Sequence, residues 1–259
     1  MDGDETDTTI AATRNSFRVL DALVESGPVG VTDLDASLDL SKSTIYNHLV
    51  TLEELGYVVR DGTTYRVGLR FERLAANARN RYPFVGRAVP EIERLAKNSG
   101  LRTAVVVEEN GWGVCVETVA GSDDVDPPMR PGERLALHAS APGKAILSAL
   151  PDAEVQHLLD RRGLFALTDD TITTWDELRA DLQNARERRL AIEREESRPG
   201  LSGVATPITD LQGRVLGAIC VFSAVESMSG KRVRQDLPGL LANTKRRIEN
   251  DLRPGSDEG

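Results

Sequence analysis

Short polar side chains gather on one arc of the segment after Ser41, and their chemistry suits hydrogen bonding to nucleic acid. An asparagine amide can form two hydrogen bonds to an adenine edge, and serine or threonine hydroxyls can bond bases or phosphates. At about 100° per residue, an apolar stripe of Ile45, Leu49 and Leu52 turns this arc outward. The candidate DNA contacts on or beside the arc are Lys42, Ser43, Thr44, Tyr46 and Asn47.

Asn47 is the first choice for direct contact with a base, and Lys42 and Tyr46 are placed to hold phosphates. The backbone amides of residues 42–44 form an anion site of their own at the helix start. The competing interpretation is that these residues are merely solvated positions on a surface helix. The place of the segment within a helix-turn-helix and ahead of a hairpin favours DNA contact.

Three helical segments position this arc. Over residues 10–24 apolar side chains recur with the helical period, until Gly27-Pro28 interrupts them. A short second segment runs over residues 32–40. Ser41 suits the N-cap of the third helix, and Gly56 closes it.

A hairpin follows, with strands at residues 57–60 and 64–67 and the turn pair Asp61-Gly62 between them. It places Arg60 and Arg66 near its tip, where they can reach a DNA backbone or minor groove. Three helices followed by a hairpin are the order of a winged helix-turn-helix, which we expect over residues 10–68. An α+β core with no ligand is the alternative.

The charge of the chain conflicts with DNA binding at first sight. The formal net charge is -9, with 41 acidic and 32 basic residues, whereas affinity for DNA normally comes largely from cations that meet phosphates. Only 5 of the basic residues are lysines. A cytoplasm at very high salt removes the conflict, because salt screens the repulsion and hydrated carboxylates keep the protein dissolved. We therefore expect a halophilic archaeal source, with ordinary acidic solubility as the alternative.

The rest of the chain indicates a linker and a second domain. Residues 69–82 are predicted as a linker and dimerisation helix, and residues 83–254 as a domain in which strand pairs interleave with helices. It lacks a glycine-rich phosphate loop, which favours an α+β sensor-type domain. Helices are expected at 84–97, 142–150, 152–161, 175–189 and 231–252, and strands at 103–108, 112–119, 135–138, 202–208 and 214–222.

One helix start in this domain has the features of an anion site. Ser140 can cap the helix and Pro142 fits its first turn. The amides of residues 143–145 then point at whatever lies before the helix, and Gly143 lets a ligand come close. An ordinary helix start packed under a sheet explains these residues equally well.

The sequence resembles IclR-type transcriptional regulators from about residue 12 to residue 252. The resemblance rests on Leu-Asp-Leu-Ser-Lys-Ser-Thr-Ile-Tyr-Asn-His-Leu at 38–49 and on His-Ala-Ser-Ala-Pro-Gly-Lys-Ala-Ile-Leu at 138–147, which is similar to the family's His-x-(Ser/Thr)-Ala-x-Gly-Lys-Ala segment. Residues 200–213 resemble a second family signature. The resemblance implies a winged helix-turn-helix, a linker helix that pairs subunits and a GAF-like, antiparallel-sheet effector domain that tetramerises in many members.

The resemblance also implies effector contacts at Ser140, Gly143, Lys144, Asp210 and Cys220. Asp210 can bond a ligand hydroxyl, and Cys220 can contribute a weakly polar wall. Without the resemblance, Asp210 is a turn former and Cys220 a buried small side chain.

Two departures from the family pattern alter the expected pocket wall. Gly203 stands where the second signature often has Cys or Ser, and Phe222-Ser223-Ala224 stand where many members have Ser-Gly-Pro. The effector is therefore expected only as a class, that of small carboxylates such as keto acids, sugar acids and aromatic acids.

Other classes of protein find little support. Cys115 and Cys220 lie far apart and lack metal-ligand spacing, so neither a metal nor a cofactor is expected. No apolar run approaches the ~18 residues of a membrane span, and residues 1–9 are acidic where a secretory signal is basic, so we expect a cytoplasmic location. Residues 200–204 lack the closing glycine of a nucleophile elbow, so we do not expect an enzyme.

These patterns predict a regulator that binds an inverted-repeat operator in double-stranded DNA as a homodimer or tetramer. A small organic effector, carboxylate or sugar-derived, is expected to change its operator affinity. The alternatives are a DNA-binding architectural or adaptor protein whose second domain only oligomerises and, less favoured, a small-molecule hydrolase.

Overall fold

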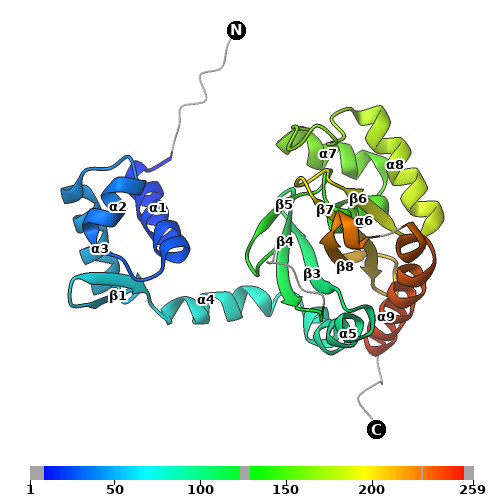
Figure 1. The fold of residues 1–259 in the computed structure, drawn as a ribbon, viewed down its shortest axis with the longest axis horizontal. Helices are drawn as coiled ribbons and strands as arrows, with labels where there is room; N and C mark the ends of the chain where they lie inside the picture. The colour runs from blue at the N-terminus through cyan, green and yellow to red at the C-terminus, as the bar shows by residue number, and fades with distance from the viewer. Residues whose placement is uncertain (1–8, 123–128, 229, 254–259) are drawn as a thin grey trace. The chain divides into compact units, whose positions relative to one another are not determined.

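The computed structural model describes residues 9–122, 129–228 and 230–253 and divides the chain into two compact units (Figure 1). The first unit ends at Asn80 and the second starts at Arg81. The acidic residues 1–8 and residue 254 of the expected second domain lie outside the described residues. Within the described ranges no helix is long and apolar enough to cross a membrane, and no three potential metal ligands cluster.

The first unit has the predicted order of a winged helix-turn-helix. Its core comes from all three helices and the hairpin, with Leu23, Leu34 and Leu49 almost fully buried. Asp61 pairs with Thr64 across the hairpin, so the tip is Gly62-Thr63, one residue later than predicted. The elements are α1 (Ala11–Ser26), α2 (Val31–Ser37), α3 (Lys42–Glu54), β1 (Val58–Asp61), β2 (Thr64–Val67) and α4 (Arg70–Arg79).

The second unit is built on an antiparallel sheet that in the described residues has six strands in the order β5-β4-β3-β8-β7-β6. This confirms the α+β, antiparallel-sheet prediction. The strands are β3 (Arg102–Glu109), β4 (Trp112–Val119), β5 (Arg134–Ala136), β6 (Ala191–Arg194), β7 (Leu201–Thr209) and β8 (Val215–Ala224). The helices are α5 (Phe84–Ser99), α6 (Ala141–Ser148), α7 (Asp152–Arg162), α8 (Trp175–Arg188) and α9 (Leu237–Asp251).

Helices cover both faces of this sheet (Figure 1). On the central strand β3, Ala104 and Val106 join the core under α6, α7 and α8, whereas Val105 and Val107 join the core under α5 and α9. Successive side chains of a strand point to opposite faces, so a strand buried on both sides is apolar throughout.

Two elements differ from the sequence prediction. Strand β6 was not predicted, because it has four residues, two of them charged, and starts just after Arg189, whose left-handed φ of 57° ends α8. The last helix was predicted as one unbroken helix from residue 231. Residues 230 and 231 are helical, but Arg232–Asp236 form a π-helical turn before α9 starts at Leu237.

Candidate functional site

Hydroxyl groups fix the start of α3, the helix predicted to contact DNA and called the recognition helix below. Ser41 Oγ accepts a hydrogen bond from the Thr44 backbone N–H at 3.2 Å. It also lies 2.9 Å from Ser43 Oγ and 2.8 Å from Thr44 Oγ1. The predicted contacts Ser43 and Thr44 therefore belong to the cap network, which confirms Ser41 as the N-cap.

The structure brings the other predicted contacts of α3 to its surface. Lys42, Tyr46 and Asn47 are exposed, and Ile45 on the inner face is fully buried. Lys42 Nζ lies 3.6 Å from Asp35 Oδ2 on α2, a pair that water screens. An exposed amide, phenol and ammonium thus share the outer surface of the helix.

The two wing arginines lie on opposite faces of the hairpin. Arg60 pairs with Tyr65 and Arg66 pairs with Val59, so their side chains alternate. Arg60 Nε donates to the Gly62 carbonyl at 2.9 Å, and its guanidinium lies 5.7 Å from the centre of the Tyr65 ring. Arg60 is therefore tied to the wing tip, whereas Arg66 is exposed on the other face.

An apolar groove of about 540 Å³ runs between α1, α3 and α4. Phe17 and Leu74 line it, with 57% and 50% of their surfaces exposed. Asn47 and Thr51 lie along its rim. The recognition helix thus borders an uncovered apolar surface, the α1–α4 groove.

In the second unit, Ser140 caps α6 as predicted. Its Oγ accepts from the Gly143 N–H at 3.3 Å and donates to the Ala136 carbonyl at 2.9 Å. A Cβ at position 143 would lie only 2.4 Å from the Leu137 carbonyl oxygen. Gly143 is thus required by close packing of the chain, and its amide is satisfied by the cap.

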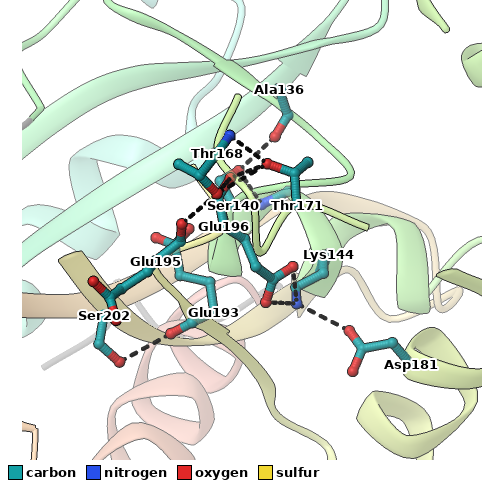
Figure 2. A network of polar contacts seen from close by, with 11 residues as sticks. Ala136, Ser140, Lys144, Thr168, Thr171, Asp181, Glu193, Glu195, Glu196 and Ser202 are labelled. Atoms are coloured by element: carbon teal, nitrogen blue, oxygen red, sulfur yellow. Dashed lines mark hydrogen bonds and ion pairs between the residues drawn. The ribbon is translucent and has the colours of Figure 1, made fainter. Parts of the chain in front are cut away.

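Lys144 is the centre of a buried ion cluster (Figure 2). It is 1% exposed, and its Nζ donates to Glu196 Oε1 and Oε2 at 2.7 and 2.9 Å and lies 3.0 Å from Asp181 Oδ2. Burial raises the pKa of Glu196, and the Lys144 ammonium opposes that shift. Lys144 therefore ties α6 to α8 and to the segment after β6.

A cavity of about 250 Å³ opens beside the α6 cap, and Ser140 is part of its wall. Glu193 lines it with 3% exposure, and the exposed Arg134 and Arg198 also line it. Arg198 Nη2 lies 3.9 Å from Glu133 Oε1 in the same wall. The remaining wall residues are Trp112, Met129, Glu133, Leu135, Ala136, Phe165, Leu167, Ser197 and Leu201.

One carboxylate oxygen of Glu193 has no partner among the described residues of this cavity, although the carboxyl also accepts from Ser197 and the Ala141 backbone. Its Oε2 is buried without a hydrogen-bond partner in the described residues, and burial raises the pKa of its carboxyl to about 7. Gly203 lies directly opposite on β7, where a Cβ would come within 3.2 Å of Glu193 Oε1 and 3.3 Å of Ala141 Cβ. The glycine departure therefore makes room for the glutamate side chain.

The segment that carries Phe165 is fastened over the cavity. His138 Nε2 lies 3.0 Å from the Phe165 carbonyl oxygen. Thr168 Oγ1 and Thr171 Oγ1 each donate at 2.6 Å, to the backbone carbonyls of Glu195 and Glu196 (Figure 2). These contacts hold the loop that connects α7 and α8, and with it the Phe165 ring, against the segment that follows β6.

The two remaining effector candidates lie elsewhere. Asp210 is in the β7–β8 turn, where it accepts from the Gln212 and Arg214 backbone N–H groups, both at 2.9 Å, and from Arg214 Nε at 2.7 Å. It lines a separate hollow with Tyr82. Cys220 is fully buried in the sheet, with its Sγ 3.8 Å from the Ala104 carbonyl oxygen. The structure thus brings neither side chain into the cavity beside Ser140.

Family models match the chain in two blocks. The IclR helix-turn-helix domain matches residues 12–62, and the C-terminal domain of the bacterial transcriptional regulator IclR matches residues 77–250. The chain belongs to the IclR family of transcriptional regulators. This IclR regulator therefore pairs a DNA-binding helix-turn-helix with an effector-binding domain, as the sequence predicted.

Individual relatives support the same assignment. The transcriptional regulator BhcR of Paracoccus denitrificans is 30% identical over 253 residues, which cover 96% of this chain and 90% of that protein. The probable regulator ArcR of Halobacterium salinarum is 28% identical over 245 residues, 93% of each protein.

Solved structures of relatives confirm the fold. The IclR protein of Thermotoga maritima has a TM-score of 0.78 and 24% identity, covering 93% of this chain and 98% of that one. An IclR homologue of Microbacterium hydrocarbonoxydans, complexed with 4-hydroxybenzoate, has a TM-score of 0.72 and 23% identity, covering 94% of this chain and 99% of that one.

Proposed function

We propose that this IclR regulator binds an inverted-repeat operator as a homodimer or a dimer of dimers and that a small hydroxylated organic acid changes its operator affinity. Two recognition helices would enter major grooves about one helical turn apart, or a multiple of it. The free energy that couples effector binding to operator binding is usually ~1–3 kcal/mol. The DNA contacts in this proposal are Lys42, Ser43, Thr44, Tyr46, Asn47, Arg60 and Arg66.

The unpartnered Oε2 of Glu193 carries the effector part of the proposal. A buried acceptor without a donor costs free energy that a ligand hydroxyl can recover. The exposed Arg134 and Arg198 suit a carboxylate, which would compete with Glu133 for Arg198. Trp112 and Phe165 form aromatic walls. Together these groups fit a small acid that has a hydroxyl at one end. The 4-hydroxybenzoate of the Microbacterium relative has this chemistry.

Replacing Glu193 by glutamine is expected to weaken binding of 4-hydroxybenzoate by about 5- to 100-fold, because the ligand hydroxyl loses a charged acceptor. Benzoate lacks the hydroxyl, so its binding should change little. Since ionised Glu193 is the better acceptor, the parent protein should bind 4-hydroxybenzoate more tightly as pH rises through about 7, the raised pKa of this carboxyl. The variant should lose that pH dependence. Isothermal titration calorimetry at several pH values measures both effects.

Asp210→Asn is the matched control, because Asp210 is the carboxylate implied by the family resemblance and lies in a different hollow. If this variant loses hydroxy-acid binding and the Glu193 variant keeps it, the effector site is at the β7–β8 turn. If no acid binds the parent protein or raises its melting temperature, the adaptor alternative is favoured, since a ligand of the folded state must stabilise it.

The α1–α4 groove is the proposed dimer surface of the first unit. Apolar surface that remains open beside a functional helix is typical of protein interaction sites. Helix α4 has no buried residue in the described structure. Leu69, just before it, and Leu74 within it are apolar but 82% and 50% exposed. A second copy that covers these side chains would join two recognition helices in one dimer, so that both could bind the same operator.

Replacing Phe17 by aspartate is expected to convert dimers to monomers and to weaken operator binding by at least tenfold, because a carboxylate would be buried in the apolar contact. Sedimentation velocity and a gel-shift titration measure the two effects. Leu211→Asp is the control, since Leu211 is also 57% exposed but lies in the second unit. Dissociation by Leu211→Asp alone would place the subunit contact in the second unit instead.

A further inference from the structure

A second pair of hollows lies on the α9 face of the sheet, beside strand β6 at the end of the strand order. They measure about 400 and 620 Å³ and share Arg188, Leu190 and Pro238. Ile192, which lines one of them, points to the face of β6 opposite that of its neighbour Glu193, which lines the cavity beside Ser140, the proposed effector cavity. We call this feature the arginine groove.

The lining of the arginine groove is basic although the chain as a whole is acidic. The chain has 41 acidic and 32 basic residues, but Glu249 is the acid among the groove's described lining residues. Its Oε1 accepts from the Thr209 N–H at 2.9 Å and lies 3.4 Å from Lys245 Nζ. The Glu249 carboxylate and the Lys245 ammonium therefore neutralise each other. The cations left over are Arg188, Arg189, Arg234 and Arg246.

None of these four arginines forms an ion pair in the part of the chain that the structure describes. Other arginines of the second unit do: Arg179 and Arg186 pair with Asp152, and Arg247 pairs with Glu91. Guanidinium groups gathered on one groove repel one another unless an anion lies between them. Their planar donor arrangement matches carboxylate and phosphate oxygens.

The floor of the arginine groove is apolar. Leu190, Ile192, Val233 and Pro238 are each half-buried there. A purely inorganic anion would leave this surface uncovered, whereas an organic ligand would cover it. The volumes of the hollows lie in the range of about 300–1,000 Å³ that is usual for small-molecule sites.

We propose that the arginine groove is a second ligand site, separate from the effector cavity, for an organic anion that carries two carboxylate or phosphate groups on an apolar body. The two anionic groups bind arginines on both sides of the groove, Arg188 and Arg189 at the end of α8 and Arg246 on α9. The apolar body packs on Leu190 and Pro238.

Isophthalate, with two carboxylates on an apolar ring, is the probe for calorimetric titration of the full chain at fixed chloride concentration. The variant Arg188→Gln/Arg246→Gln is expected to bind it at least tenfold more weakly. The control Lys97→Gln/Arg161→Gln also loses two exposed cations of the second unit and should bind within twofold of the parent. Benzoate and inorganic pyrophosphate should each bind the parent more weakly than isophthalate.

Three results would overturn the proposal. Equal weakening in both double variants would show that the net charge, and not the groove, attracts the ligand. Unchanged binding in Arg188→Gln/Arg246→Gln would place isophthalate elsewhere, with Glu193→Gln testing the effector cavity. A changed sedimentation coefficient of the groove variant without ligand would show that this face is a contact between copies of the chain.

Discussion

Replacing Asn47 by alanine is expected to reduce discrimination between operator and random duplex by about 10- to 100-fold, while weak non-specific binding remains. A side chain that makes two hydrogen bonds to one base contributes ~1–3 kcal/mol of discrimination. Asn47 is the exposed amide of the recognition helix, set outward by the buried Ile45 and Leu49. Non-specific affinity comes from phosphate contacts, which the alanine variant keeps.

A competition gel shift in multimolar KCl measures this discrimination. High salt is chosen because a chain of net charge -9 repels the duplex in dilute buffer. Asn184→Ala is the control, since Asn184 is an exposed amide on α8 in the second unit. Unchanged discrimination in the Asn47 variant would show that another side chain, with Tyr46 next to be tested, reads the sequence.

The first unit could be predicted because its signals are local. Ser41 and the apolar stripe that follows it lie within one helix, and the cap hydrogen bond joins residues three apart. Gly56, just past the helix, has the positive φ of 76° that favours glycine. The one-residue error at the hairpin tip concerns register, which depends on pairing between the two strands.

The cavity beside Ser140, the proposed effector site, could not be predicted in the same way, because the residues that form it lie in different strands. In the sequence, residues 193–196 resemble a solvated charge run. In the structure Glu193 and Glu196 are buried on either side of the exposed Arg194. Gly203 leaves room for the Glu193 side chain because the two residues pair across β6 and β7. The sequence does not show this pairing, since β6 is too short to recognise.

The family resemblance pointed to α6, but it did not show which residues there line the cavity and which are tied into the fold. Ser140 lines the cavity, whereas Lys144 lies in an ion cluster whose Glu196 is 52 positions away in the chain. A buried lysine needs a partner, and only the tertiary fold identifies it. We therefore expect the stability of the second unit to depend on Lys144.

Replacing Lys144 by methionine is expected to lower the free energy of unfolding of the second unit by about 3–5 kcal/mol, because Glu196 is left as a buried carboxylate without its cation. Urea titration followed by tryptophan fluorescence reports this unit, since Trp112 and Trp175 both lie in it. Lys97→Met, which changes an exposed lysine on α5, should have little effect.

The pH dependence and a second substitution distinguish a lost ion pair from a packing defect. Burial raises the pKa of Glu196 and Lys144 opposes this, so without Lys144 the folded state takes up a proton at Glu196 more readily. The deficit of Lys144→Met should then shrink as pH falls, since protonation removes the uncompensated charge. Lys144→Met/Glu196→Gln should recover much of the loss at neutral pH, because both charges are gone. A deficit that is independent of pH and not relieved by the second change would show that Lys144 stabilises α6 by packing alone.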